Sequence, residues 1–357
     1  MRVAIQASHL AGEVRGIGRY VWALLPRLAA LRPELRFTLH IKNPRDEARL
    51  EPRLDAIAAL DGRVQFAPLS DLPKTRADVA WYPWNVAKPL ARYAPIIVTM
   101  HDIANVAMPD PRFTAAWKNL RWRLLYNRTA KRATLILADS EFTAREIERV
   151  LHVGAETVRV VRLAADDFSV ANGEDPQPLF TRLGVTQPYV LTAGAKDRRK
   201  NLALVERAMS RLNAAGSSAT LVLAGPRRDD ARAYSPTWRN AIGFVSDSDL
   251  AMLYKHASAL VVPSTYEGFG LPVLEAMHSG CAVVCADAAS LPEVGGDAAL
   301  WVQPNDDLTL ADTLTTLLGD PALRRSLGER GKERARTFSW DETAQGTLAA
   351  LDEAARR

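Results

Sequence analysis

Residues 263–280 have the sequence PSTYEGFGLPVLEAMHSG, and this segment decides the fold of the chain. It follows a short apolar run at 260–263, which predicts a buried strand. Pro272 then stands where proline is best tolerated, in the first turn of a helix. A strand, a loop and a helix in this order form the repeating unit of an open, mostly parallel α/β sheet.

The loop inside this segment has the composition of an anion-binding loop. Gly268 and Gly270 remove side chains just before the helix, where backbone amides gather at its positive end. The amides that can approach an anion belong to Phe269, Gly270 and Leu271. Glu267 precedes the loop, and Glu275 follows eight residues later, where we expect the first turn of the helix. A tight turn with an acidic helix start would explain any one of these features by itself.

Apolar runs alternate with helical patterns on both sides of this segment. We expect strands at 2–7, 35–41, 64–67, 78–82, 96–100, 134–138, 158–161, 189–193, 219–224, 260–263 and 282–286. We expect helices at 20–31, 47–60, 115–131, 142–151, 202–214, 249–256, 272–279, 323–336 and 340–355. The fold class is therefore α/β, with helices on both faces of mostly parallel sheets.

The alternation pauses once, at residues 166–188, which are rich in proline, glycine and acidic residues. We interpret this stretch as a linker between two domains, 1–168 and 169–338. The last residues, 339–357, predict a helix that crosses back to the first domain. Two open α/β domains in series place a ligand at the carboxyl ends of their strands.

A basic cluster follows the strand at 189–193. The segment YVLTAGAKDRRKNL, residues 189–202, runs from this strand through a glycine turn and four basic residues into a helix. A nucleoside diphosphate needs about two positive charges, which Arg199 and Lys200 would supply. A solvated basic face is the alternative interpretation of such a cluster.

Two further candidates lie in the first half of the chain. Gly16 and Gly18 follow the first strand, but no acidic residue stands about 20 positions later as in NAD-binding folds. His101 directly follows the strand at 96–100, and the carboxyl end of such a strand faces the ligand. A histidine that merely caps the strand end is the alternative.

Together these segments resemble the family-4 retaining glycosyltransferases, which have the GT-B fold of two Rossmann-like domains facing each other across a cleft. The pair Glu267 and Glu275 matches the family signature E-x7-E. The resemblance implies that Glu267 lies at the donor hexose and that Glu275 hydrogen-bonds the ribose hydroxyls. It implies that the backbone at Phe269, Gly270 and Leu271 holds the hexose and the distal phosphate.

The same resemblance assigns the other candidate residues. Arg199 and Lys200 would bind the diphosphate, and the loop with Gly16 and Gly18 would face the donor phosphates and the acceptor. The stretch around Val245 would lie against the nucleotide base. His101 would contact the transferred sugar, so that His101 and Glu267 are the expected catalytic residues.

We therefore expect a retaining hexosyltransferase, with GDP-mannose favoured over a UDP-sugar as donor. The acceptor is expected to be a hydroxyl of a glycan or lipid-linked glycan in bacterial surface-polysaccharide synthesis. We expect no cofactor and no metal, because the D-x-D sequence at 247–249 is better explained as a helix cap. Two alternatives remain: a GT-B nucleotide-sugar 2-epimerase, and a non-catalytic nucleotide-sugar-binding module. Loss of Glu267 is expected to lower turnover and barely change affinity for the nucleoside diphosphate.

Composition and charge indicate the class of protein and the partners that it can have. The chain has 357 residues, 48% apolar and 24% charged, with no apolar run long enough to span a bilayer. The sequence begins directly with a strand, so we expect a cytoplasmic protein without a secretory signal. Cys281 and Cys285 lie in a buried strand pattern and are expected to be core residues. No nucleic-acid-binding motif accompanies the positive charge, so we expect no nucleic-acid partner.

The positive charge lies in the first half of the chain. Residues 1–168 carry 26 lysines and arginines against 18 acidic residues, whereas residues 169–357 carry 20 against 23. Residues 117–132 hold six basic residues and no acidic one. On a helical wheel Arg121 and Arg128 fall beside Trp117 and Leu124, so we favour a partly buried domain helix over a lipid-inserting one. Peripheral contact with an anionic membrane stays open.

Overall fold

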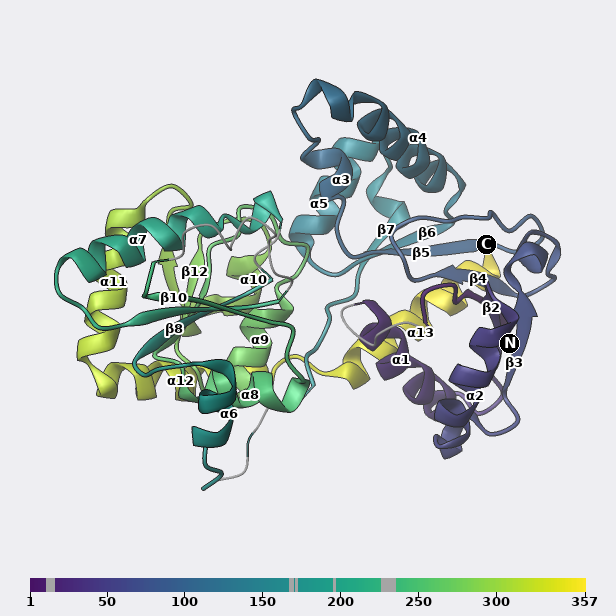
Figure 1. Cartoon of the computed structure of the whole chain (residues 1–357). Coiled ribbons are helices and arrows are strands. Elements are labelled where there is room, and N and C mark those ends of the chain that lie inside the picture. The colour runs from purple at the N-terminus through teal and green to yellow at the C-terminus, as the bar shows by residue number, and fades with distance from the viewer. Residues whose placement is uncertain (11–16, 167–169, 171–172, 195–196, 226–235) are drawn as a thin grey trace. The chain divides into compact units, whose positions relative to one another are not determined.

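The computed structural model describes residues 1–10, 17–166, 170, 173–194, 197–225 and 236–357. These residues form two compact α/β units, one of Met1–Leu163 with Ser339–Arg357 and one of Ala164–Phe338. The division falls slightly before the boundary expected at 168/169. Figure 1 shows that each unit is built around its own sheet.

The first unit contains a parallel seven-stranded sheet in the order β3-β2-β1-β4-β5-β6-β7. Its strands are β1 Arg2–Gln6, β2 Arg36–Ile41, β3 Val64–Pro68, β4 Val79–Tyr82, β5 Ile96–Met100, β6 Leu135–Ala138 and β7 Val158–Val160. Every residue of β4, β5 and β6 is buried, because helices cover both faces of a parallel sheet. The strand order reverses between β1 and β4, and ligands of such sheets bind at this kind of switch point.

Six α-helices of the first unit connect or cover these strands. They are α1 Ile17–Leu31, α2 Glu47–Asp55, α3 Ala104–Ala107, α4 Ala116–Arg132, α5 Glu141–Leu151 and α13 Trp340–Arg356. The hydroxyl of Ser140 accepts a hydrogen bond from the amide of Thr143 at 3.0 Å and so caps α5. The last helix, α13, packs on α1, and Arg32 at the end of α1 forms a two-pronged ion pair with Asp352.

The second unit contains a parallel six-stranded sheet in the order β10-β9-β8-β11-β12-β13. Its strands are β8 Tyr189–Ala193, β9 Thr220–Ala224, β10 Arg239–Gly243, β11 Ala259–Val262, β12 Val283–Ala286 and β13 Leu300–Val302. The switch point lies between β8 and β11. The loops that leave these two strands therefore begin at the same edge of the sheet, and they carry the candidate donor site.

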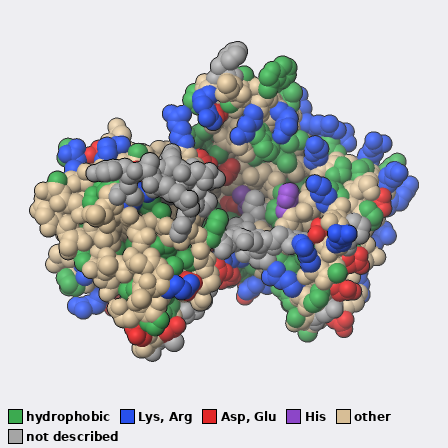
Figure 2. Space-filling model, viewed as in Figure 1, with side chains coloured by type: hydrophobic (Ala, Val, Ile, Leu, Met, Phe, Trp, Pro, Cys, Tyr) green, Lys and Arg blue, Asp and Glu red, His purple; other side chains and the backbone are tan. Residues whose placement is uncertain are grey.

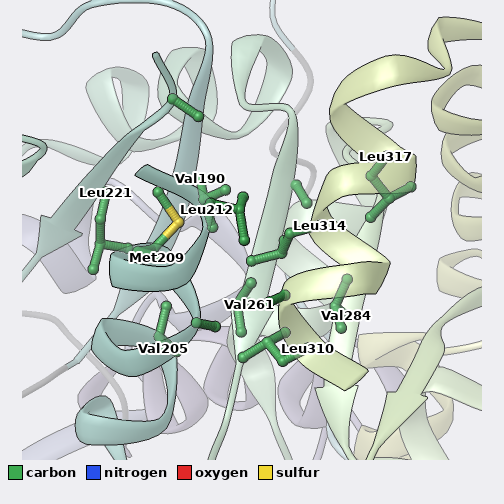
Figure 3. Packing of buried hydrophobic residues seen from close by; sticks show 14 of the residues in the cluster. Val190, Val205, Met209, Leu212, Leu221, Val261, Val284, Leu310, Leu314 and Leu317 are labelled. Atoms are coloured by element: carbon green, nitrogen blue, oxygen red, sulfur yellow. The ribbon is translucent and has the colours of Figure 1, made fainter. Parts of the chain in front are cut away.

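The helices of the second unit are α6 Gln177–Leu183, α7 Leu202–Ala214, α8 Asp247–His256, α9 Leu271–His278, α10 Leu291–Gly295, α11 Asp307–Gly319 and α12 Pro321–Ala335. Figure 3 shows α7 and α11 packing on the sheet through buried side chains such as Met209, Leu314 and Val261. Each such side chain contributes about 1.5–3 kcal/mol relative to an exposed one. Cys281 and Cys285 are buried core residues as predicted, and burial raises the pKa of the Cys281 thiol to about 12.

Candidate active site

The loop between β11 and α9 has the conformation that its glycines predicted. Gly270 precedes α9 with a φ of +116°, which side chains rarely permit. A Cβ at this position would also lie 3.0 Å from a methyl carbon of Leu291. Pro272 is the second residue of α9, so the helix begins at Leu271, one residue before the expected start at 272. The first-turn amides of an α-helix have no intrahelical acceptor, which makes this end of α9 suited to an anion.

Two further contacts fix the loop from behind. Phe269 packs its ring edge to face against Phe338, with 5.8 Å between ring centroids, so its side chain belongs to the core. The buried Ser290 hydroxyl lies 2.9 Å from the carbonyl oxygen of Glu267 and 2.8 Å from that of Phe269. Ser290 was not predicted as a site residue, because its position 23 residues after Glu267 gives no local signal.

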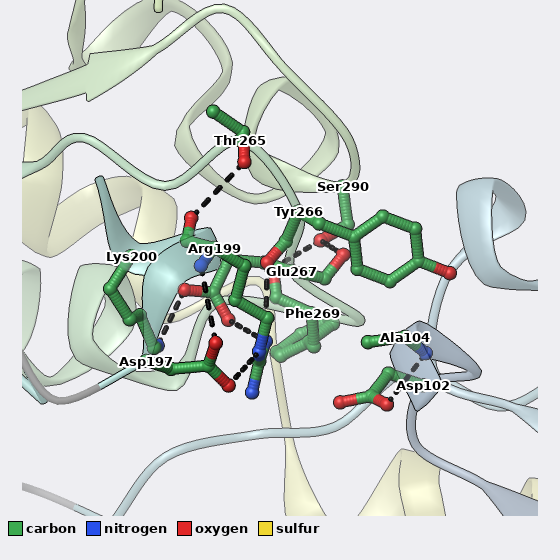
Figure 4. Close-up of polar contacts among 10 residues, drawn as sticks. All are labelled: Asp102, Ala104, Asp197, Arg199, Lys200, Thr265, Tyr266, Glu267, Phe269 and Ser290. Carbon is green, nitrogen blue, oxygen red and sulfur yellow. Dashed lines mark hydrogen bonds and ion pairs between the residues drawn. The ribbon is translucent and has the colours of Figure 1, made fainter. Parts of the chain in front are cut away.

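Glu267 is the centre of a charged cluster (Figure 4). The residue is only 6% exposed, and its Oε1 lies 2.5 Å from the Nζ of Lys200. Its Oε2 lies 3.3 Å from a terminal nitrogen of Arg199. The structure thus brings together three of the predicted residues, although the sequence analysis assigned the carboxylate and the two cations to different parts of the donor.

Backbone contacts hold the two cations at this place. Arg199 and Lys200 lie in a short 3₁₀ turn after β8, and the carbonyl oxygen of Arg199 accepts the amide of Thr265 at 2.8 Å. The Arg199 guanidinium also donates to Asp197 at 3.0 Å and to the carbonyl oxygen of Tyr266 at 3.1 Å. Both basic side chains are mostly buried, so this part of the cluster is not a solvated face.

Asn201 joins the two loops of the site. It adopts a left-handed backbone conformation with a φ of +48° at the start of α7. Its side-chain amide donates to the carbonyl oxygen of Pro263 at 3.2 Å and to that of Pro304 at 2.7 Å. The loop after β8 is thereby tied to the end of β11, which keeps Arg199 and Lys200 beside Glu267.

Glu275 lies in a different environment from Glu267. It is the fifth residue of α9 and therefore lies in the second turn, so the first-turn position expected from the sequence is wrong. The helix starts at Leu271, and its first turn contains no acidic residue. The Tyr254 hydroxyl of α8 donates to Oε2 of the buried Glu275 at 3.1 Å. Tyr254 thus holds this carboxylate, a role that no motif in the sequence indicated.

The remaining donor-side candidates lie near the end of β10. Val245 is half-buried in the short connection between β10 and α8. The cap of α8 is Ser246, whose hydroxyl accepts the amide of Asp249 at 3.1 Å, so Asp247 is not the cap. The Asp249 carboxylate is engaged by Arg182 at 2.8 Å. Among the residues that the structure describes, no group of three or more histidine, cysteine and acidic side chains is placed to hold a metal ion.

His101 forms a dyad with Asp139 in the first unit. The two residues directly follow β5 and β6, whose last residues, Met100 and Ala138, are partners in register. The Nδ1 of His101 lies 2.7 Å from Oδ2 of Asp139, and its Nε2 lies 3.1 Å from the carbonyl oxygen of Pro83. This pairing was not predicted from the sequence, although adjacent strands with a polar residue after each would have indicated it.

The partners of His101 favour its doubly protonated form. With Asp139 ionised, both bonds exist together only when both ring nitrogens carry a proton, because a carboxylate and a carbonyl oxygen can only accept. Burial raises the pKa of Asp139 and so opposes its ionisation, whereas the charge of His101 and the hydrogen bond to it act in the opposite direction. Burial lowers the pKa of His101, but the charge of Asp139 and the hydrogen bond to it outweigh that effect and raise the pKa. Tyr20 packs its ring edge to face against His101, with 5.0 Å between centroids.

The glycine-rich candidate is only partly described. Gly16 lies outside the described residues. Gly18 is the second residue of α1, so it belongs to a helix and not to the loop that the sequence indicated. Because α1 starts at Ile17, it includes Tyr20, whose ring contacts the ring of His101.

Comparison with known proteins identifies the family. Residues 180–334 match the family described as glycosyl transferases group 1. The O-antigen chain mannosyltransferase B of Escherichia coli is 30% identical over 381 residues, which cover 98% of this chain and 99% of that protein. The MMP alpha-(1->4)-mannosyltransferase of Mycolicibacterium hassiacum is 42% identical over 117 residues, 32% of this chain and 28% of that protein.

The fold is shared with solved structures, among them WaaG, a glycosyltransferase involved in lipopolysaccharide biosynthesis, with a TM-score of 0.71 at 14% identity over 99% of each chain. HepE of Anabaena, crystallised with UDP and glucose, matches with a TM-score of 0.74 at 19% identity, over 99% of this chain and 100% of that one. The predicted α/β architecture and the predicted family are therefore confirmed. The chain belongs to the group 1 glycosyl transferases, and it is a hexosyltransferase with the GT-B fold.

Proposed function

We propose that this enzyme transfers mannose, with retention of configuration, from GDP-mannose to a hydroxyl of a glycan or lipid-linked glycan. The observation that carries the proposal is the cluster of Arg199, Lys200 and Glu267 at the sheet edge where β8 and β11 end. Such an edge is where open α/β sheets bind ligands. The names of two relatives, an O-antigen chain mannosyltransferase and an MMP mannosyltransferase, support mannose as the transferred sugar, and the first of them supports surface-polysaccharide synthesis.

The cluster supports a specific sequence of contacts on donor binding. In the structure, the carboxylate of Glu267 pairs with both of the cations that a diphosphate requires, and Asp197 supplies a second negative charge to Arg199. The diphosphate displaces Glu267 from Lys200 and Arg199, and the released carboxylate is then available to hydrogen-bond the hexose hydroxyls. In this account the cations balance the leaving-group charge, and no metal is required.

The proposed catalytic step is front-face attack. The bond from the anomeric carbon to the diphosphate oxygen breaks, the acceptor oxygen bonds to the same face of that carbon, and the proton of the acceptor hydroxyl passes to the departing diphosphate oxygen. Glu267 orients the hexose while its anomeric carbon gains positive charge. We propose that Asp139 fixes the orientation of the His101 ring through Nδ1, and that Nε2 of His101 exchanges its contact with the Pro83 carbonyl oxygen for a hydroxyl of the transferred sugar. The donor-side contacts of Val245, Gly270 and Glu275 remain predictions from the family resemblance.

Turnover assays distinguish this function from its alternatives. The enzyme is incubated with GDP-mannose or a UDP-sugar, with and without a mannan acceptor, and nucleotide release is measured. Acceptor-dependent release of GDP supports the proposal. Isomerisation of the donor without acceptor would indicate the epimerase, and binding without any turnover would indicate a binding module.

A further inference from the structure

The helix α4 exposes a row of large apolar side chains. Trp117 is 82% exposed, Leu120 46% and Leu124 61%, and their spacing of three and four residues places them on one face of the helix. The opposite face carries Tyr126 and Ala130, which are buried in the core of the first unit. The apolar row is therefore additional to the face that anchors α4 to its own domain.

Positive charge accompanies this row. The seventeen residues of α4 include no aspartate or glutamate. Its six basic residues are Lys118, Arg121, Arg123, Arg128, Lys131 and Arg132. Within the part of the chain that the structure describes, none of the six forms a salt bridge, whereas other surface arginines such as Arg149 do. Figure 2 shows basic and apolar side chains gathered over the part of the molecule that Figure 1 labels α4.

On the helical wheel, basic and apolar side chains of α4 are mixed, and from the sequence this mixing argued against lipid contact. Because the structure shows which face of α4 is buried, the mixed residues can be assigned to the outer face. Arg121 and Arg128 flank Trp117 and Leu124 on the outer face, not across the helix from it. A lipid headgroup layer accepts both kinds of side chain at one depth. The indole and leucines enter the boundary with the acyl chains, while arginine stems extend their charges to the phosphates.

We propose that α4 is a docking surface for a membrane rich in anionic lipid. The continuous positive charge is complementary to an anionic headgroup layer, which attracts each nearby basic residue. A nucleic acid would engage the same cations but would leave the apolar row exposed to water. No helix in the described ranges is both long and apolar enough to cross a bilayer.

Vesicle sedimentation tests this proposal with the full chain. The probes are vesicles of phosphatidylcholine alone and of phosphatidylcholine with phosphatidylglycerol. We expect binding to the anionic vesicles, weak binding to the neutral ones, and release at high salt. Because removal of one charge costs about fivefold in binding, Arg121→Gln with Arg128→Gln should weaken binding by at least tenfold. Trp117→Ala with Leu124→Ala should weaken binding to the anionic vesicles at low salt, although it leaves the charge unchanged.

Matched controls lie on the second unit. Arg325→Gln with Arg336→Gln removes the same charge from α12 and its end, and Leu308→Ala removes a leucine that is 60% exposed on α11. Neither control should change vesicle binding. Equal effects of the control and α4 variants, no binding to anionic vesicles, or tighter binding to duplex RNA than to vesicles would each overturn the proposal. The assay uses no sugar donor, so its outcome is independent of the proposed function.

Discussion

The substitution Glu267→Gln is predicted to tighten the binding of GDP. In the structure this carboxylate lies 2.5 Å from the Nζ of Lys200 and 3.3 Å from a terminal nitrogen of Arg199, so a diphosphate that binds these two cations has to displace it. Glutamine keeps the shape and can still accept a hydrogen bond, but it removes the charge. The expectation from sequence alone, that this change barely affects GDP affinity, is therefore revised.

The magnitude follows from the ion pairs that binding has to break. At an effective dielectric constant of about 20, two unit charges about 4 Å apart attract by about 4 kcal/mol before desolvation is counted. A charge-assisted hydrogen bond contributes about 1.5–3 kcal/mol net, and glutamine retains part of it. We therefore expect the Kd for GDP to fall about tenfold, which corresponds to about 1.4 kcal/mol. Turnover should fall by about an order of magnitude or more, because the Glu267 contacts strengthen as the sugar gains charge.

Calorimetric titration with GDP and steady-state turnover measure the two effects in one preparation. Asp197→Asn is the matched control, since Asp197 pairs with Arg199 but its side chain is more than half exposed, so GDP affinity should change little. In the double variant Lys200→Ala with Glu267→Gln, the tightening should largely disappear. Unchanged or weaker GDP binding by a Glu267→Gln variant with near-normal thermal unfolding would mean that the diphosphate does not displace Glu267 from Lys200 and Arg199.

Four further predictions follow from the same geometry. Lys200→Ala should weaken GDP binding by about 1.5–3 kcal/mol in titrations, and an unchanged Kd would remove Lys200 from the donor site. Glu275→Gln should weaken GDP and GDP-mannose alike, and an effect on the sugar donor alone would contradict a ribose contact. Turnover should survive EDTA, and a strict requirement for added Mg²⁺ or Mn²⁺ would contradict charge balance by Arg199 and Lys200. Because Asp139 raises the pKa of His101, activity that depends on the protonated ring should be lost as the pH rises through that raised value. In Asp139→Asn this loss should move to lower pH, and an unmoved pH profile would mean that the dyad is only structural.

The strands could be predicted where burial dictates their composition. The central strands β5 and β6 are short apolar runs, because both faces of the sheet are covered. The edge strand β10 has the polar sequence RNAIG, and β13 has only three residues, so neither gave a clear signal. The sequence analysis therefore found the centre of the second sheet and missed both of its edges.

The site was predicted residue by residue, but its pairings were not. Lys200 and Glu267 are 67 positions apart, and only the adjacency of β8 and β11 brings their loops together. His101 and Asp139 meet for the same reason, through the register of β5 and β6. Family resemblance assigns each residue to a part of the ligand. It therefore gives no information on contacts between the residues themselves.

The sequence alone did not indicate which face of α4 is exposed. A helical wheel gives the angular order of Trp117, Arg121 and Leu124, but it does not say which side packs on the domain. That information comes from the tertiary structure, through the buried Tyr126.

Retention of the configuration of a mannosyl donor is the proposed stereochemical outcome of this hexosyltransferase. The most direct measurement is NMR of the product formed from GDP-mannose and a mannan acceptor, with GDP release followed in parallel. The account predicts an α-linked mannosyl product and release of GDP that depends on the acceptor. A β-linked product, or turnover with a UDP-sugar and none with GDP-mannose, would contradict it.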